Sequence, residues 1–273
     1  SSVFAAMSGV MPMRNTAAET IPPREIRNDC RGERMRYNNY HKHTMYSNLR
    51  TLDCISKPID YINRAKVLGH TTYFTTEHGY QSNIFEAYTL CQEHGLKCIY
   101  GVEAYYVDDI NDKSSRSMYH IILIAMTENG RKEINRIMSM ANTDGYYYKP
   151  RIDLEILEEY SEGLICLSAC LAGSLSNAIL EDNINKAKEV ALWHKRVFGE
   201  DYYLEIQNNG IPEQVLINQK IIELSRELDI PLVATNDAHY LKKEDSYNHE
   251  ILLCIQTAKK MIDEDRMRFG SDE

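Results

Sequence analysis

The sequence lacks any apolar run long enough to cross a membrane. The longest candidate, Ile121–Met126, is far shorter than the roughly 20 residues that a membrane-spanning helix needs. The first residues, Ser1–Val10, also lack the basic start and the long apolar stretch of a secretory signal. We therefore expect a protein without a membrane partner.

The sequence also lacks a cysteine pattern that would indicate disulfide bonds. The chain has 7 cysteines, an odd number, and they form no C-x-x-C pair. This pattern argues against a disulfide framework and favours a reducing compartment, because disulfides persist in oxidising surroundings. The expected location is the cytoplasm.

An excess of basic residues is also absent. The 31 lysines and arginines are outnumbered by 40 acidic residues, which gives a formal net charge of −9. A protein that held nucleic acid by a broad basic surface would have the opposite balance. If the chain acts on nucleic acid, the contact must be local or carried by metal ions. Otherwise the acidic surface simply aids solubility.

Residues 1–34 show weak periodicity, and we interpret them as a leader, a tag or a flexible arm. After Met35, short β-rich runs alternate with helix-like stretches, which predicts βαβ units and a mainly parallel sheet. The predicted strands are Tyr73–Thr76, Cys98–Val107, His120–Met126, Leu164–Ser168, Tyr202–Gln207 and Pro231–Thr235, with Asn39–Thr44 as a plausible first strand. The predicted helices are Pro58–Leu68, Ile84–His94, Glu128–Asn142, Asn185–Phe198 and Pro212–Leu228. About seven such units fit an α/β barrel better than an open sheet, although a doubly wound sheet remains an alternative.

Histidine and carboxylate residues fall repeatedly at the predicted strand ends. His41 and His43 form an H-x-H pair at the end of the first strand, and Asp237 and His239 form a D-x-H pair after the last. Side chains at positions i and i+2 of an extended segment face the same side, so each pair can reach one metal ion. The other candidates of this kind are Asp53, His78, Glu103, His120 and Cys170.

These nine side chains are expected to converge, because the C-terminal ends of all strands meet at one face of an α/β barrel. Nitrogen, oxygen and thiolate donors favour zinc, manganese or iron over calcium or magnesium. Taken singly, a histidine at a strand end is more often structural, and Cys170 is a small buried hydrophobe. The four other histidines are interpreted as structural or exposed: His70, His94, His194 and His249.

Six motifs carry a family resemblance. They are His41-Lys-His-Thr-Met-Tyr-Ser47, Thr76-Glu-His-Gly79, Gly101-Val-Glu-Ala-Tyr-Tyr106, Tyr146-Tyr-Tyr-Lys-Pro-Arg-Ile-Asp153, Leu167-Ser-Ala-Cys-Leu-Ala-Gly173 and Ala234-Thr-Asn-Asp-Ala-His-Tyr-Leu241. Together they resemble the polymerase and histidinol phosphatase (PHP) domain, and within that family the PHP domain at the N-terminus of the bacterial DNA polymerase III alpha subunit. The resemblance covers about residues 36–269, and we assign the domain to residues 35–273. Its last residues, Leu252–Lys259 with Arg268 and Phe269, resemble the stretch that leads into the polymerase portion.

The resemblance implies a distorted seven-stranded (β/α) barrel, the PHP barrel, with two or three divalent metal ions at the C-terminal ends of its strands. The first ion would be held by His41, His43, Glu103 and Asp237. Glu103 would bridge to a second ion, held also by His120 and Cys170. The third would be held by Asp53, His78 and His239.

Two positions depart from the family pattern. Glu77 stands before His78 where the family usually has an aspartate, so the longer carboxylate is expected to shift that loop. Extra residues separate Ser47 from Asp53, which makes Asp53 the least secure of the nine assignments.

Adjacent metal ions suit the hydrolysis of phosphate esters, because they lower the pKa of a bound water and neutralise the phosphate oxygens. We therefore expect a metal-bound hydroxide to attack phosphorus, with no protein nucleophile. Lys149 and Arg151 are candidate phosphate contacts, and Tyr148 is a candidate for stacking on a base. The alternative is that this tyrosine-rich loop merely packs over the mouth of the barrel.

The resemblance implies a 3′→5′ exonuclease that proofreads or trims the single-stranded or frayed 3′ end of DNA, with the polymerase part of an alpha subunit as a further partner. The chain has no polymerase palm, so DNA synthesis is not expected of it. Two alternatives remain: a small-molecule phosphatase of the histidinol-phosphate type, and a non-catalytic scaffold domain of a polymerase.

Overall fold

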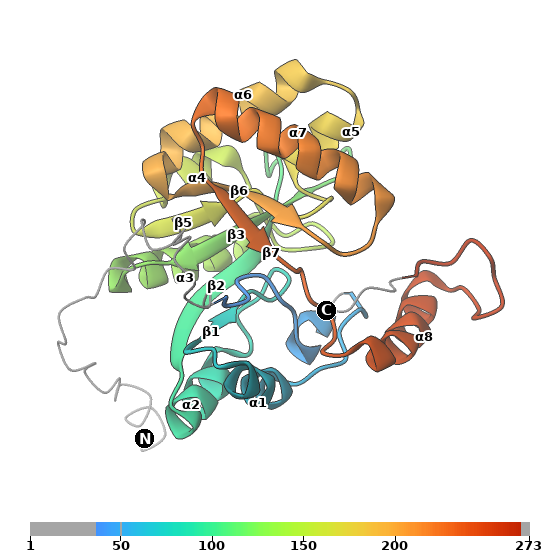
Figure 1. The fold of residues 1–273 in the computed structure, drawn as a ribbon. Helices are drawn as coiled ribbons and strands as arrows, with labels where there is room; N and C mark the ends of the chain where they lie inside the picture. The colour runs from blue at the N-terminus through green and yellow to red at the C-terminus, as the bar shows by residue number, and fades with distance from the viewer. Residues whose placement is uncertain (1–36, 50, 269–273) are drawn as a thin grey trace, which may run out of the picture.

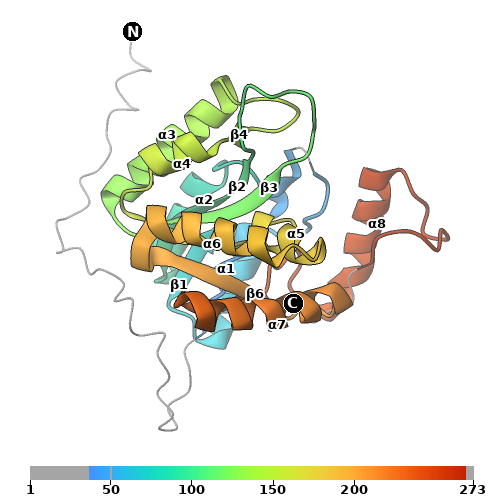
Figure 2. The same cartoon turned by 90° about the horizontal axis from the view of Figure 1, so that it is seen from above.

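The computed structural model describes residues 37–49 and 51–268, and a curled seven-stranded sheet lies at its centre (Figures 1 and 2). The strands are β1 (Thr72–Thr75), β2 (Lys97–Tyr106), β3 (Tyr119–Ala125), β4 (Arg151–Ile152), β5 (Leu164–Leu167), β6 (Tyr202–Gln207) and β7 (Leu232–Thr235). The helices are α1 (Pro58–Leu68), α2 (Ile84–His94), α3 (Glu128–Thr143), α4 (Leu154–Glu159), α5 (Ser174–Leu180), α6 (Ile184–Phe198), α7 (Pro212–Leu228) and α8 (Ser246–Thr257). The predicted leader, residues 1–34, lies outside the described residues.

The five predicted helices are confirmed as α1, α2, α3, α6 and α7, with ends that agree to within one residue. Proline and glycine fix several of these ends. Pro58 begins α1, where a missing N–H costs nothing, and Gly69 ends it in the left-handed conformation with φ 76°. Gly95 ends α2 in the same way with φ 71°.

The sheet order is β1-β2-β3-β5-β6-β7, with β4 paired to β2. Four of its pairings are parallel, as predicted, but β3 runs antiparallel to both β2 and β5. A parallel return needs a crossover, usually helical, and residues 107–118 between β2 and β3 contain no helix. The beginning of β3 therefore lies at the same edge of the sheet as the ends of the parallel strands.

The predicted first strand, residues 39–44, is reduced to a single parallel bridge between Lys42 and Ala238, just after β7. The His43 amide donates to the Ala238 carbonyl at 2.8 Å, and the Ala238 amide donates to the His41 carbonyl at 3.3 Å. On the other side, Thr76 Oγ1 follows β1 and bonds the backbone of Lys42, accepting from its amide at 3.0 Å and donating to its carbonyl at 2.8 Å. The segment thus joins β7 to β1 and completes the curl.

The described residues form three apolar cores, of which one lies among α1, α2 and β1, and alternation along the strands separates the other two. The larger core lies between the outer face of the sheet and α3–α7, and it includes Val102, Leu123 and Leu204. The smaller core fills the inside of the curl and includes Phe74, Ile122, Ile124, Leu167, Tyr203 and Val233. Polar side chains follow these inner residues along the same strands, so the smaller core forms the floor of a polar site.

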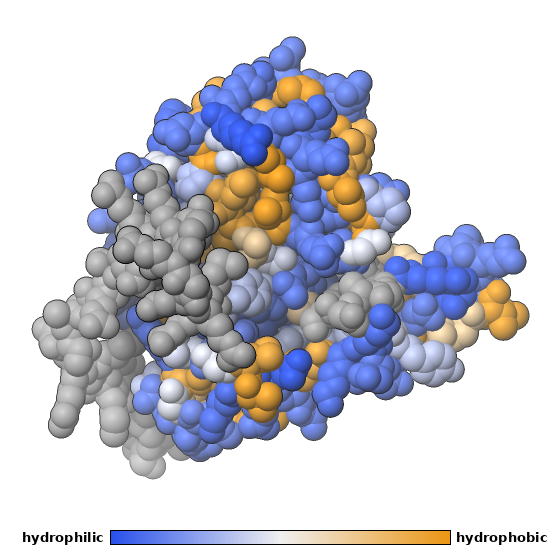
Figure 3. Space-filling model, in the orientation of Figure 1, coloured by the Kyte–Doolittle hydropathy of each residue, from blue (hydrophilic) through white to orange (hydrophobic). Residues whose placement is uncertain are grey.

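The helix α8 projects from the rest of the fold in both ribbon views (Figures 1 and 2). It was not predicted, and neither were the short α4 and α5. Hydrophilic residues cover much of the face in Figure 3, with apolar patches between them. Within the described part of the chain, no helix is both long and apolar enough to cross a membrane.

Candidate metal centre

The nine predicted side chains meet in overlapping groups at one end of the curl. In each group, one donor atom per residue lies within 4.8 Å of the others. The groups are His41, His43 and Asp237; His43, His78 and Glu103; Glu103, His120 and Cys170; and Asp53, Cys54, His78 and His239. Glu103, His43 and His78 each belong to two of the groups, so they connect the groups into one cluster.

The H-x-H pair presents two imidazole nitrogens to one carboxylate. His41 Nδ1 donates to Glu205 Oε1 at 2.7 Å, and His43 Nδ1 lies 3.3 Å from Ser47 Oγ. The two Nε2 atoms lie 3.1 Å apart, and each lies 3.1 Å from Asp237 Oδ1. With neutral imidazoles, three lone pairs converge on one point, and such a convergence fits a cation.

Glu103 is fully buried, and its two carboxylate oxygens face different histidines. Its Oε1 lies 2.9 Å from His120 Nδ1, while its Oε2 contacts His78 Nδ1. Cys170 Sγ lies 3.9 Å from Oε1. A carboxylate with imidazoles on both oxygens has the arrangement of a bridging ligand between two metal ions.

The backbone of β2 brings Glu103 into this position. Gly101, two residues earlier, packs so closely between β1 and β3 that a Cβ there would lie 2.8 Å from the carbonyl oxygens of Thr75 and Leu123. His120 reaches the cluster because β3 runs antiparallel to its neighbours. In a wholly parallel barrel the first residues of a strand would lie at the opposite face.

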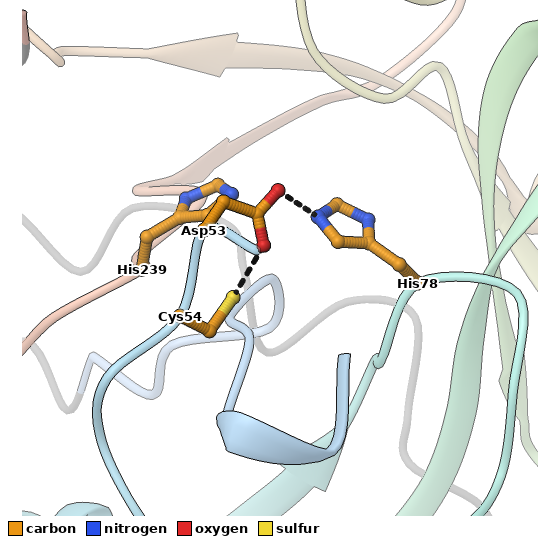
Figure 4. A group of neighbouring side chains, drawn as sticks. All are labelled: Asp53, Cys54, His78 and His239. Atoms are coloured by element: carbon orange, nitrogen blue, oxygen red, sulfur yellow. Dashed lines mark hydrogen bonds and ion pairs between the residues drawn. The ribbon is translucent and has the colours of Figure 1, made fainter. Parts of the chain in front are cut away.

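Asp53, the least secure assignment, joins the cluster. Its Oδ2 lies 3.4 Å from His78 Nε2, and His239 lies beside it (Figure 4). Asn48 fixes the turn across the extra residues, since its Oδ1 accepts from the amides of both Asp53 and Cys54. Asn48 therefore compensates for the added length of the loop.

Charges within the cluster shift the pKa values of neighbouring groups in opposite directions. Burial, aided by the nearby His78, lowers the pKa of His43 to about 3. Burial opposes the charged form of His78 too, but Glu103 and Asp53 outweigh it and raise its pKa to about 10. The stacked rings of these two histidines, 3.8 Å apart, thus favour one charged and one neutral partner.

Glu205 is a buried member of the site that sequence reasoning missed. Its Oε1 accepts from His41 Nδ1 and from Gln207 Nε2 at 2.8 Å, and Thr235 Oγ1 also donates to it. It therefore fixes which nitrogen of His41 faces the cluster. A signal existed, because Glu205 alternates with Tyr203 and Gln207 on the inner face of β6.

Glu77 lies outside the cluster and braces the loop after the H-x-H pair. Its carboxylate accepts from the Thr44 amide at 2.9 Å, from Ser47 Oγ at 2.6 Å and from Asn83 Nδ2. Ser47 Oγ in turn accepts from the His78 amide at 3.0 Å. The longer side chain of Glu77 thus connects the loops that carry His43 and His78.

The three predicted substrate contacts have different surroundings. Lys149 Nζ lies 4.1 Å from the centre of the Tyr105 ring, beside the histidines of the cluster. Tyr148 is 48% exposed, and the Arg116 guanidinium packs 3.7 Å above its ring. Lys149 therefore lies at the rim of the site, and Tyr148 is the next residue along the chain.

The interpretation of Arg151 as a phosphate contact does not fit the structure. Its side chain is buried, and its guanidinium donates to the carbonyls of Gly145 at 3.1 Å, Asp112 at 3.0 Å and Ile110 at 2.7 Å. The guanidinium is thus buried and held by three backbone carbonyls instead of facing the site. Arg151 instead ties the tyrosine-rich loop to the connection between β2 and β3.

A family model described as the PHP domain matches residues 39–209, which include seven of the nine clustered side chains. The chain belongs to the PHP domain family. The two further members of the cluster in this PHP domain, Asp237 and His239, follow β7 beyond the matched stretch.

This PHP domain is similar to the DNA polymerase III subunit alpha of two bacteria. The identity is 39% over 245 residues with the protein of Borreliella burgdorferi and 41% over 249 residues with that of Campylobacter jejuni. The matches cover 88% and 87% of this chain, but only 21% and 20% of those proteins. The chain thus spans about a fifth of the length of the curated relatives that it matches.

Among solved structures, an amidohydrolase from Chromobacterium violaceum aligns with a TM-score of 0.45 at 12% identity. The alignment covers 73% of this chain and 86% of the amidohydrolase chain.

Proposed function

We propose that this PHP domain is a metal-dependent phosphoesterase that removes nucleotides from the 3′ end of DNA. We propose further that it does so as part of, or in association with, a DNA polymerase III alpha subunit. The observation that supports the proposal is the convergence of nine donor side chains in overlapping groups, two of which share Glu103. The polymerase relatives are the reason to name DNA as the substrate.

The nine side chains would provide the ligands of three metal positions. His41, His43 and Asp237 would hold one ion, and Glu103 would bridge it to a second one beside His120 and Cys170. Asp53, His78 and His239 would hold a third. Bound zinc, manganese or iron would activate water and neutralise the phosphate oxygens. Glu205 and Ser47, which contact the Nδ1 atoms of the H-x-H pair, would keep the Nε2 atoms directed toward the first ion.

The rim of the site offers a local contact for a DNA end. Lys149 has its ammonium beside Glu103 and Asp53, whose charges oppose the lowering of its pKa by burial. It can therefore contact a phosphate that reaches the ions. The exposed ring of Tyr148, with Arg116 on its other side, offers a base a stacking surface of the kind found in single-strand binding sites. Such a contact is compatible with the net charge of −9.

The test is the digestion of a single-stranded oligonucleotide labelled at its 5′ end, with manganese or zinc. We expect a ladder that shortens from the 3′ end, with nucleoside monophosphates as the product. Asp237→Asn and His43→Ala should abolish the ladder, because each removes a donor from the first group. His94→Ala, which changes a histidine outside the cluster, should leave it unchanged.

Two outcomes would contradict the proposal in different ways. Faster hydrolysis of a small phosphomonoester such as histidinol phosphate than of DNA would favour the phosphatase alternative. A purified chain that bound less than one metal ion and released no nucleotide would favour the scaffold alternative.

A further inference from the structure

We propose that Cys54 is a fourth ligand of the metal position formed by Asp53, His78 and His239. The inference rests on the metal centre of the proposed function and adds a donor that none of the sequence motifs supplied. A metal ion there would be bound by two imidazoles, a carboxylate and a thiolate. Four ligands of these types are typical of zinc sites.

The four donor atoms already lie close together. Cys54 Sγ, the Asp53 carboxylate and one nitrogen of each histidine are all within 4.8 Å of one another. Cys54 Sγ donates to Asp53 Oδ1 at 3.0 Å, while Asp53 Oδ2 faces His78 Nε2 at 3.4 Å. Figure 4 shows the thiol and the two imidazoles arranged around the same carboxylate.

The backbone turn explains how two consecutive residues reach one position. Neighbouring side chains of an extended chain point to opposite sides. Here Asn48 accepts from the amides of both Asp53 and Cys54, and its Nδ2 donates to the Cys54 carbonyl at 2.6 Å. This clamp bends the chain so that the carboxylate and the thiol are directed to the same side.

The surroundings of Cys54 distinguish it from a cysteine that only fills space. Cys91 and Cys166 are buried within apolar cores. Cys54 is 1% exposed, yet it belongs to none of the three apolar cores of the described residues, and its thiol contacts a carboxylate.

Metal binding at Cys54 would exchange one bond for another. The S–H bond breaks, the proton leaves to solvent, and the sulfur electron pair binds the cation. The centre would then have thiolates at two of its metal positions, through Cys54 and Cys170, whereas His41, His43 and Asp237 offer only nitrogen and oxygen. Soft donors favour zinc, iron or cobalt over manganese or magnesium, so the positions should differ in metal preference.

Cobalt(II) is a suitable probe, because a thiolate bound to cobalt gives a charge-transfer absorption in the near ultraviolet. We expect this band when the metal-free chain is titrated with cobalt. Cys54→Ser should lose about half of its intensity, since one of two thiolate ligands is removed. Cys170→Ser should retain the remaining part, and the double variant should lose it all. Cys98→Ser, outside the cluster, should behave as the unaltered chain.

Zinc affinity gives a second readout by calorimetry. Cys54→Ser should weaken binding at one position by roughly 10- to 100-fold or more, because even the loss of an outer partner of a ligand costs that much. An unchanged band in Cys54→Ser, or no band in a folded Cys170→Ser variant that still binds cobalt, would overturn the role of Cys54 and leave the metal centre standing. No cobalt binding by the unaltered chain would overturn the centre itself.

Discussion

At the scale of single residues, the direction of each imidazole depends on the groups behind it. His41 is oriented by Glu205, and His43 by Ser47, which is itself held by Glu77. Partners of this kind set the tautomer of a histidine ligand and increase its basicity. Their removal should change metal binding while leaving the nine donors in place.

We expect Glu205→Gln to weaken metal binding by roughly 10- to 100-fold, as is typical for such outer partners. The glutamine oxygen can still accept from His41 Nδ1, but the negative charge that favours cation binding is lost. Isothermal titration with zinc or manganese measures the effect. Glu200→Gln is the matched control, because Glu200 is exposed. Equal metal affinities in the two variants would show that Glu205 does not contribute to metal binding.

His194 provides a pH-dependent test of the outer core. Burial lowers its pKa to about 4 from an ordinary value of 6.5, and its ring stacks on Tyr202. Between these two values the unfolded chain binds a proton that the folded chain does not, so stability falls as the pH falls from 6.5 toward 4. His194 should account for roughly 3 kcal/mol of that loss at most.

In His194→Phe the free energy of unfolding should depend less on pH over this interval. Urea titrations at pH 7 and pH 4.5 measure the difference, with His94→Ala as the control. The same pH dependence in His194→Phe and in the unaltered chain would mean that His194 is accessible to solvent.

The sequence singled out nine side chains that the fold brings together, because their residue types and their spacing at strand ends are local properties. It was insufficient for Glu205 and Cys54. The alternation along β6 indicates that Glu205 faces inward, but not that it contacts His41, which is distant in sequence. Cys54 depends on the Asn48 turn, whose shape no periodicity encodes. The expectation for Arg151 did not anticipate its burial, because the two-residue strand β4 is too short to show a pattern in the sequence.

At the scale of elements, the tyrosine-rich loop depends on one buried guanidinium. Arg151→Lys should loosen this loop, because a single ammonium cannot bond three diverging carbonyls as the guanidinium does. The expected loss of stability is about 1–3 kcal/mol. Faster chymotrypsin cleavage at Tyr146–Tyr148 would report the loosening. Arg136→Lys is the control, because its side chain is 60% exposed.

The helices were predictable because proline and glycine mark their ends, and several strand boundaries followed from apolar runs. The direction of β3 was not predictable, since period-2 alternation is the same in parallel and antiparallel strands. The bridge at Lys42 could not be predicted from the sequence either, because its partners, Ala238 and Thr76, are distant in sequence. Short elements such as α4 span too few residues to show a helical period.

At the scale of the whole molecule, the cluster gathers carboxylates, imidazoles and two thiols whose side chains are largely buried. A cation that binds the folded chain alone should therefore stabilise it. One site filled at 100 times its dissociation constant contributes about 2.7 kcal/mol. Each kcal/mol moves the Tm of a chain of this size by about 2–4 °C.

We therefore expect zinc or manganese to raise the Tm by roughly 5–10 °C for one filled site, and a chelator to reverse the change. Differential scanning calorimetry measures it. Asp237→Asn should reduce the increase, whereas His94→Ala should retain it. A Tm that changes neither with metal nor with chelator would contradict a metal centre in this cluster.

The reversed direction of β3 has a consequence for how such a site can diversify. Because β3 begins at the site edge, the connection at residues 107–118 belongs to the rim, where Arg116 already meets Tyr148. Insertions or deletions in this connection would reshape the entrance without disturbing the strands that carry the donors. Variation in length at this one place is thus a route by which the same metal-binding floor can accept substrates of different size.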